Sequence, residues 1–208
     1  MPTITSLKVQ KRNKTRINVY LDDEFAFGLT YDVAAMLKIG QTLSPEEITE
    51  LTQKEIFEQA RLAAIRLIEV RPRSVTEISR RLHQKGYEPD VITAVIERLQ
   101  KVQLLDDVAF AKYWLDQRQT FKPRSQIALR QELQQKGVDR KIIDATLNDL
   151  DETAAIRQVA KKQARRYSEL PEIEFKQKLG RFLQRRGFSY GIIRPIIDEL
   201  WTSSNEDN

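Results

Sequence analysis

One pattern of about fifty residues occurs three times in this chain, and it constrains the fold more than any other feature. The three copies can be aligned on Gly86, Gly137 and Gly187 without a gap. The matched positions are Ile78, Leu129 and Leu179; Leu82, Leu133 and Leu183; Lys85, Lys136 and Arg186; Tyr87, Val138 and Phe188; Ile92, Ile143 and Ile193; Ile96, Leu147 and Ile197; Leu99, Leu150 and Leu200. Each set keeps its chemical class, which indicates an internal repeat.

Each copy predicts a helix, a tight turn and a second helix. In the first copy, Ser74 with Glu77 forms a capping-box pattern that starts a helix. Gly86 ends that helix, and Pro89 suits the first turn of the next one. A third helix is expected ahead of each pair, at 55–70, 108–118 and 153–167. Three-helix modules of this size bury little surface alone, so neighbouring modules should pack together.

The first thirty residues follow a different pattern. Apolar and polar residues alternate over 3–10, 16–21 and 24–29, and Asn13 and Asp22–Asp23 suit the intervening turns. This pattern predicts a three-stranded antiparallel meander. Such a small sheet is stable only when one face is covered.

The helix expected after the meander would supply that cover. Thr30 is its expected cap, and Val33, Met36 and Leu37 would form its apolar stripe. Ser44-Pro45-Glu46-Glu47 then starts another helix, which either runs straight into the first repeat or breaks near Thr52–Gln53.

The predicted fold is therefore mainly α, a tandem array of three three-helix modules behind a small β-meander with its helix. The expected divisions are 1–52 for the N-terminal part, 53–107, 108–152 and 153–201 for the modules, and 202–208 for a disordered tail. Apolar residues make up 40%, charged residues make up 31%, and glycine and proline number only seven each, which favours amphipathic helices over sheet.

Composition also limits the chemistry and the compartment. The absence of cysteine excludes disulfides and thiolate metal sites. No apolar run reaches the length of a signal peptide or a membrane-spanning helix. We expect a cytoplasmic monomer without membrane association.

No catalytic constellation is present. His83 is the one histidine, no glycine-rich phosphate loop occurs, and the four glycines at 40, 86, 137 and 187 read as helix stops. We expect a binding protein without enzymatic activity, cofactor or metal.

Positive charge is concentrated in two stretches. Residues 71–86 contain five lysines and arginines and one glutamate. Residues 157–194 contain eleven lysines and arginines and three glutamates. This distribution suggests a polyanionic partner, either nucleic acid or an acidic protein surface, although a solvated helix face explains any one cluster equally well. The candidate contacts to phosphate or to an acidic partner are Arg71, Arg73, Arg80, Arg81, Arg118, Lys122, Arg124, Arg165, Arg166, Arg181 and Arg185.

Two alternatives stay open for these cations. Arg73 and Arg124 either contact a ligand through their planar forks or bond a nearby acid or helix end. The cations that precede the repeat glycines are better explained as partners of the helix dipole. A helix-turn-helix reader of DNA is less favoured, because the second helix of each pair carries outward acids such as Asp90 and Asp144.

The combined motifs resemble the RecX family of bacterial RecA regulators. The first carrying stretch runs from Arg73-Ser74 through Ile78 to Lys85-Gly86-Tyr87, where Ile78 replaces the commoner leucine. The other stretches are Leu104-Leu105-Asp106-Asp107, Phe110-Ala111, Trp114 with Arg118, Arg124-Ser125, and Glu132-Leu133 through Lys136-Gly137-Val138. The N-terminal Lys11-Arg12-Asn13-Lys14 and Arg16-Ile17-Asn18-Val19 resemble the β-rich extension of longer members.

The resemblance implies a function. Such proteins bind RecA, lie along the groove of the RecA–DNA filament and usually inhibit strand exchange, ATP hydrolysis and coprotease activity in DNA repair and the SOS response. It implies the RecA filament as partner, with single- and double-stranded DNA as further partners. The alternative is non-sequence-specific DNA binding that competes for the strand.

Overall fold

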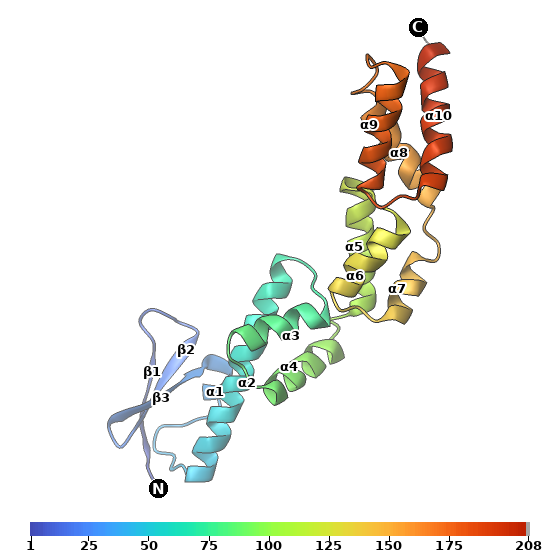
Figure 1. Ribbon diagram of the computed structural model, residues 1–208. Coiled ribbons are helices and arrows are strands. Elements are labelled where there is room, and N and C mark those ends of the chain that lie inside the picture. Colours follow the sequence, from blue (N-terminus) through green and yellow to red (C-terminus); the bar gives the residue numbers. More distant parts are fainter. Residues whose placement is uncertain (207–208) are drawn as a thin grey trace. The chain divides into compact units, whose positions relative to one another are not determined.

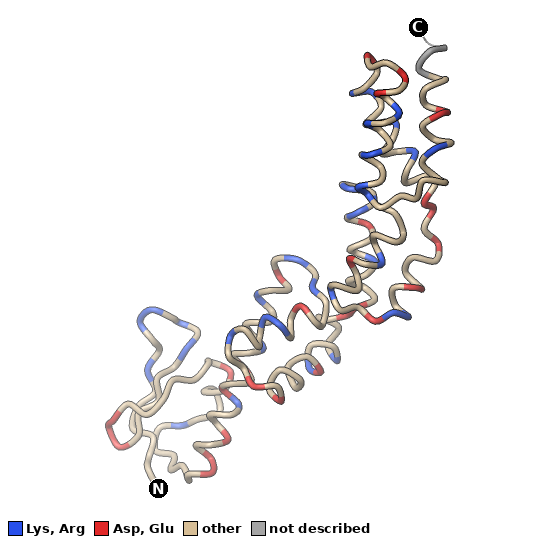
Figure 2. Tube along the Cα trace, in the orientation of Figure 1, with Lys and Arg blue, Asp and Glu red and all other residues tan. Residues whose placement is uncertain are grey.

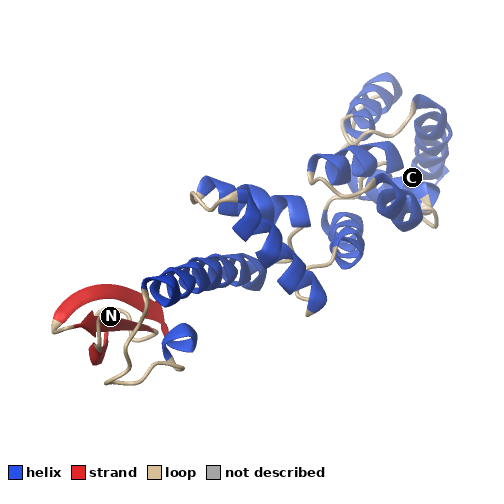
Figure 3. Ribbon diagram, turned by 90° about the horizontal axis from the view of Figure 1, so that it is seen from below, coloured by secondary structure: helices blue, strands red, loops and turns tan. Residues whose placement is uncertain are grey.

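The structure is a computed structural model that describes residues 1–206 and forms two compact units. The first unit holds Met1–Arg71 and Ile78–Leu105, and the second holds Pro72–Glu77 with the chain from Asp106 onward. Within the described residues, strands occur only in the N-terminal part of the first unit (Figure 3). The predicted class, mainly helical with a small N-terminal antiparallel sheet and tandem three-helix modules, is confirmed.

The sheet of the first unit is the expected meander. Strands β1 (Ile4–Val9), β2 (Arg16–Leu21) and β3 (Glu24–Thr30) pair antiparallel in the order β1-β2-β3 (Figure 1). Asp22 and Asp23 form the turn between β2 and β3 with φ angles of 48° and 69°. A two-residue hairpin turn of type I′ requires positive φ at both central positions, and aspartate tolerates it better than most residues.

The cover of this sheet differs from the prediction. Helix α1 (Tyr31–Ala34) is a single turn, Met36 is 85% exposed, and the Thr30 side chain makes no capping hydrogen bond. The expected stripe is therefore wrong at Met36, because a one-turn helix cannot hold residues 33, 36 and 37 on one face. The buried core instead consists of Ile4, Val19, Leu29, Ala34, Leu37 and Leu43, with Ile48 and Leu51 packed against it.

Helix α2 (Pro45–Val70) decides the alternative that the sequence left open. It runs unbroken for 26 residues, so the expected boundary after residue 52 falls inside a helix. Ser44 accepts a hydrogen bond from the Glu47 N–H, and the Glu47 carboxylate accepts one from the Ser44 N–H at 2.7 Å. This complete capping box starts the helix as predicted.

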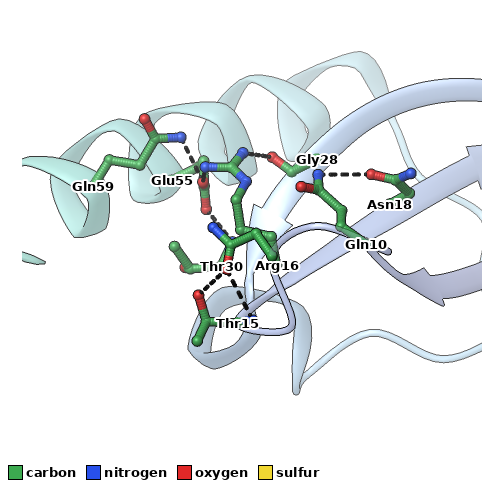
Figure 4. Close-up of polar contacts among 9 residues, drawn as sticks. Gln10, Thr15, Arg16, Asn18, Gly28, Thr30, Glu55 and Gln59 are labelled. Atoms are coloured by element: carbon green, nitrogen blue, oxygen red, sulfur yellow. Dashed lines mark hydrogen bonds and ion pairs between the residues drawn. The ribbon is translucent and has the colours of Figure 1, made fainter.

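A buried carboxylate joins α2 to the sheet (Figure 4). Glu55 is 5% exposed, and its oxygens lie 3.1 Å from the Arg16 guanidinium and 2.5 Å from the Thr30 N–H, which donates to it. Gln59 donates a third hydrogen bond at 2.6 Å, and Arg16 also donates to the Gly28 carbonyl at 2.8 Å. A buried charge is tolerated when it is paired and hydrogen-bonded in this way.

The glycine turns of the helix pairs follow the predicted geometry. Helices α3 (Val75–Gln84) and α4 (Pro89–Lys101) flank Gly86, whose φ is +85°. The Tyr87 N–H reaches back to the Leu82 carbonyl at 3.3 Å and the Gly86 N–H to the His83 carbonyl at 2.9 Å, which is the Schellman arrangement. Gly137 and Gly187 repeat it with φ of +75° and +89°.

The second unit holds two complete modules. The helices are α5 (Asp107–Phe121), α6 (Gln126–Gln135), α7 (Arg140–Leu147), α8 (Glu152–Ala164), α9 (Glu172–Gln184) and α10 (Tyr190–Glu206). Each module has its own core. One contains Phe110, Leu129, Leu133, Ile143 and Leu147, and the other contains Ile156, Phe175, Leu179, Leu183, Ile193 and Ile197.

Equivalent residues of successive repeats are hydrogen-bonded at two places within this unit, through different donor groups. The Ser74 hydroxyl donates to the Lys136 carbonyl at 2.6 Å, and the Ser125 N–H donates to the Arg186 carbonyl at 3.1 Å. Both serines precede the second helix of a repeat, and both carbonyls precede a glycine of the next repeat. We name this arrangement the cap–turn contact. It packs the start of one helix pair against the turn of the following pair.

The C-terminal end is more regular than expected. Helix α10 continues to Glu206, although 202–208 were predicted to form a disordered tail. No glycine or proline follows Leu200, and the Thr202 and Ser203 hydroxyls donate to the carbonyls one turn back. Residues 207–208 lie outside the described part of the chain.

Candidate interaction surface

Two predicted contact residues meet at one carboxylate. The Arg118 Nε lies 2.7 Å from one oxygen of Glu132, and the Arg124 Nε lies 3.0 Å from the other. The Trp114 indole N–H donates to Glu132 at 2.8 Å, and the Arg118 guanidinium lies 4.5 Å from the centroid of the Trp114 ring. We name this group, with Lys136 and Glu77 described next, the Trp114 cluster.

Lys136 adds a link between repeats to the Trp114 cluster. Its ammonium lies 2.7 Å from Glu77 and 5.0 Å from the centroid of the Trp114 ring. Both Glu77 and Glu132 are mostly buried, with 13% and 16% of the side chain exposed. Because these pairs are shielded from water, their Coulomb attraction is screened less than that of a surface ion pair, and the cost of desolvating the charges opposes it.

The Trp114 cluster bears on the two alternatives for Arg124. The structure gives Arg124 a local acid as partner, as one of the alternatives held. Arg118 and Arg124 each use Nε toward Glu132, so a ligand would meet guanidinium groups that are already oriented. Lys136, expected to be a dipole partner, also binds Glu77 of the preceding repeat.

The other predicted cations lie on several different elements. Arg80 and Arg81 are exposed on α3, Lys122 is exposed after α5, Arg165 and Arg166 are exposed after α8, and Arg181 and Arg185 are exposed on and after α9. Figure 2 shows positively charged positions spread along α8 and α9. Arg71 ends α2, and Arg73 lies between α2 and α3; both are partly buried and make contacts within the structure. The second unit thus carries exposed cations on its last module.

Sequence reasoning missed three residues beside this set. Lys162 lies one helical turn before Arg166, and both line a cavity with Arg186 and the exposed Phe121 ring. The i, i+4 spacing of Lys162 and Arg166 on a predicted helix is the signal that could have found the first of them. Nothing local indicates that Arg186 or Phe121 joins them, since the chain brings them from other helices.

Asp107 is an ionisable group whose surroundings perturb it. Burial raises the pKa of its carboxyl, the hydrogen bond from the Val75 N–H opposes this rise, and the Asp106 charge adds to it. That hydrogen bond is 2.9 Å long, while Asp106 caps α5 by accepting from Val108 and Ala109. Asp106 therefore caps α5, and Asp107 links the start of this helix to Val75 of the preceding repeat.

The raised pKa of Asp107 predicts a pH dependence of stability. The folded state holds this proton more tightly than the unfolded state, so the contribution to stability falls as pH rises from the ordinary carboxyl range through the raised pKa. Asp107→Asn keeps an oxygen for Val75 but cannot ionise. We expect the variant to gain stability relative to the parent at neutral pH and to lose that gain below about pH 3.9.

Urea unfolding at several pH values measures this difference. Asp116→Asn, an exposed position on the same helix, is the control for removal of one charge. A stability difference between Asp107→Asn and the parent that does not change with pH would contradict the assignment.

No helix within residues 1–206 combines the length and the apolar character that crossing a membrane requires. Among the same residues, no three His, Asp or Glu side chains gather closely enough to hold a metal ion.

The fold defines a class of proteins in which a small β-meander precedes tandem three-helix modules. Comparison with known proteins identifies the family within this class. Four family models match: "Regulatory protein RecX N-terminal domain" at 2–43, and the first, second and third three-helix domains of RecX at 60–99, 106–147 and 150–197. The chain belongs to the RecX family.

Individual relatives agree over nearly the whole chain. "Regulatory protein RecX" of Clostridium botulinum (strain Eklund 17B / Type B) is 32% identical over 206 residues and covers 96% of both chains. The protein of the same name from Bacillus subtilis (strain 168) is 31% identical, covering 100% of this chain and 80% of the relative. These relatives are named as regulatory proteins.

Solved structures share the fold. A crystal structure of regulatory protein RecX superposes with a TM-score of 0.72 at 25% identity, covering 95% of this chain and all of the other. The crystal structure of RecX from Lactobacillus salivarius gives 0.61 over 71% of this chain.

Proposed function

We propose that this protein binds RecA and RecA–DNA filaments and lowers recombinase, ATPase and coprotease activity in DNA repair and the SOS response. The observation that carries the proposal is membership of the RecX family over all four domains. The structure supports it physically, because two repeats contact each other within the second unit and cations are exposed on α9 and after α8. Several linked binding modules engage a periodic partner more tightly than one module alone.

The primary test is the DNA-dependent ATPase of RecA. We expect the purified protein to lower it when present in smaller molar amount than RecA, since a binder lodged along a filament acts on several protomers. Absence of any effect at every ratio would refute the proposal.

The contact residues are tested by charge reversal at exposed positions. Arg80→Glu with Arg181→Glu suits this purpose, because neither side chain is paired with a carboxylate in the described part of the chain. Arg124→Glu is less suitable, since it would place a second negative charge beside Glu132. We expect weaker inhibition of RecA from the double variant with unchanged unfolding.

Arg98→Glu with Lys141→Glu is the matched control. Both are exposed on α4 and α7, outside the predicted contact set, and the change in net charge is the same. Equal loss in the two double variants would indicate a general charge effect rather than contact by these residues.

The second candidate function is direct DNA binding that competes with RecA for the strand. The exposed cations after α8 and on α9 favour it. A salt series on DNA without RecA separates the two, since binding dominated by phosphates weakens steeply as salt rises.

A further inference from the structure

A cavity in the second unit has an unusual lining. It has a volume of about 300 Å³ and lies between the end of α5, one face of α8 and the end of α9. Three cations line it, Lys162, Arg166 and Arg186, and no carboxylate does. That volume is at the lower end of the range for small-molecule sites.

The cations of this cavity have no counter-charge. None of the three forms an ion pair with a carboxylate in the part of the chain described here. Arg186 donates through one terminal nitrogen to the Pro123 carbonyl at 3.1 Å, while its Nε is buried and has no hydrogen-bond partner. Burial and the nearby charge of Arg124 lower the pKa of Arg186. A buried donor without a partner beside like charges is a site that an anion would stabilise.

The remaining lining suits a flat ring. The Phe121 side chain is 71% exposed at the cavity, and the Phe182 ring lies 4.6 Å from the Arg186 guanidinium. Gln158 and Gln163 add amides, which can both donate and accept hydrogen bonds. Aromatic rings stack on nucleobases whatever the base, and arginine and lysine bind phosphate.

We propose that this cavity binds one nucleotide, with its phosphate against Lys162, Arg166 and Arg186 and its base against Phe121. The nucleotide comes either from the free pool or from a single strand of nucleic acid. An acidic peptide would use the cations but would leave the exposed ring and the amides unmatched. The inference does not require RecA binding, and of the three cations at the site only Arg186 belongs to the internal repeat pattern.

Matched double variants test the site. Lys162→Gln with Arg166→Gln removes two charges from the cavity, and Lys112→Gln with Lys161→Gln removes two charges from exposed positions outside it. The probes are thymidine monophosphate, inorganic phosphate, a fluorescent thymidine oligonucleotide and an acidic peptide, each titrated into the full chain. We expect the cavity variant to weaken nucleotide binding about tenfold and the control variant to change it little.

Phe121→Ala separates base from phosphate. It should weaken binding of both nucleotide probes and leave binding of inorganic phosphate unchanged. Monophosphate binding identifies the free nucleotide as a ligand, and binding of the oligonucleotide alone identifies the single strand; either supports the site.

Three results would overturn the inference: no binding of either nucleotide probe, equal loss in the two double variants, or tighter binding of an acidic peptide than of the oligonucleotide. The RecA ATPase assay on the same variants keeps the proposals distinguishable. Retained inhibition by a cavity variant that no longer binds nucleotide leaves the proposed regulation intact, and a parent protein without effect on RecA counts only against that regulation.

Discussion

Gly137→Ala is expected to lower the free energy of unfolding of the second unit by about 2–5 kcal/mol, far more than the same change at Gly86. Both glycines have positive φ, at +75° and +85°, so alanine at either position costs about 1–2 kcal/mol of backbone strain. At Gly137 the added methyl group would also overlap the Thr76 side chain, including its Cβ, which cannot move without the backbone. Overpacking of this kind costs about 1–3 kcal/mol more.

Gly86→Ala is the matched control because nothing lies within 4 Å of the position its methyl group would take. Gly187→Ala should behave like Gly137→Ala, since its methyl group would meet Ser125 at 2.6 Å and Ala128 at 2.8 Å. Urea denaturation measures all three. Equal losses at Gly86 and Gly137 would show that the cap–turn contact does not cover the second turn.

Leu133→Ala is the second large effect. Leu133 is fully buried in the core formed by α5, α6 and α7, against Phe110 and Leu147. Removing its side chain leaves a cavity among neighbours that are held by the helices, so a loss of about 2–5 kcal/mol is expected. The equivalent leucines, Leu82 and Leu183, are also fully buried and should give losses of the same order.

Ile127→Ala on the same helix is the control. Its side chain is 61% exposed, so the variant should change stability by no more than about 0.5 kcal/mol. Similar losses of stability in Leu133→Ala and Ile127→Ala would contradict the conclusion that the matched leucines of the repeat face the core.

Most of the helical architecture could be predicted from the sequence because its signals are local. Ile78, Leu129 and Leu179 are all buried, and the repeat glycines all have positive φ. Apolar spacing, caps and glycine stops act within one or two turns of helix, so a linear pattern contains them. The N-terminal meander was predicted for the same reason, from alternation and two short turns.

Features that depend on distant residues could not be predicted. Ser74 was interpreted as a cap, and it is one, but its hydroxyl also binds Lys136 far along the chain. The sequence gives no sign that Glu55 is buried, because the partners that stabilise its carboxylate, Arg16 and Thr30, come from the sheet. The matched Ser74 and Ser125 both cap their helices, but Ser74 reaches the following turn through its hydroxyl and Ser125 through its backbone N–H, so the serines alone do not predict the cap–turn contact.

The candidate surface also combines local features, which the sequence predicts, with tertiary contacts, which it does not. Counting charges finds the basic stretches, but only the folded chain shows that Arg118 and Arg124 share Glu132 while Arg181 stays exposed. Whether a cation is neutralised depends on tertiary contacts, so residue type and spacing alone do not separate a structural arginine from one available to a partner. The contact residues therefore stay predictions.

Electron cryo-microscopy of this protein on a RecA–DNA filament is the most direct test of the proposed function. The proposal predicts extra density along the filament groove, with successive three-helix modules on neighbouring protomers and Arg181 and Arg185 turned toward the filament. Bare filaments at saturating protein, or modules bound with those arginines facing solvent, would contradict it.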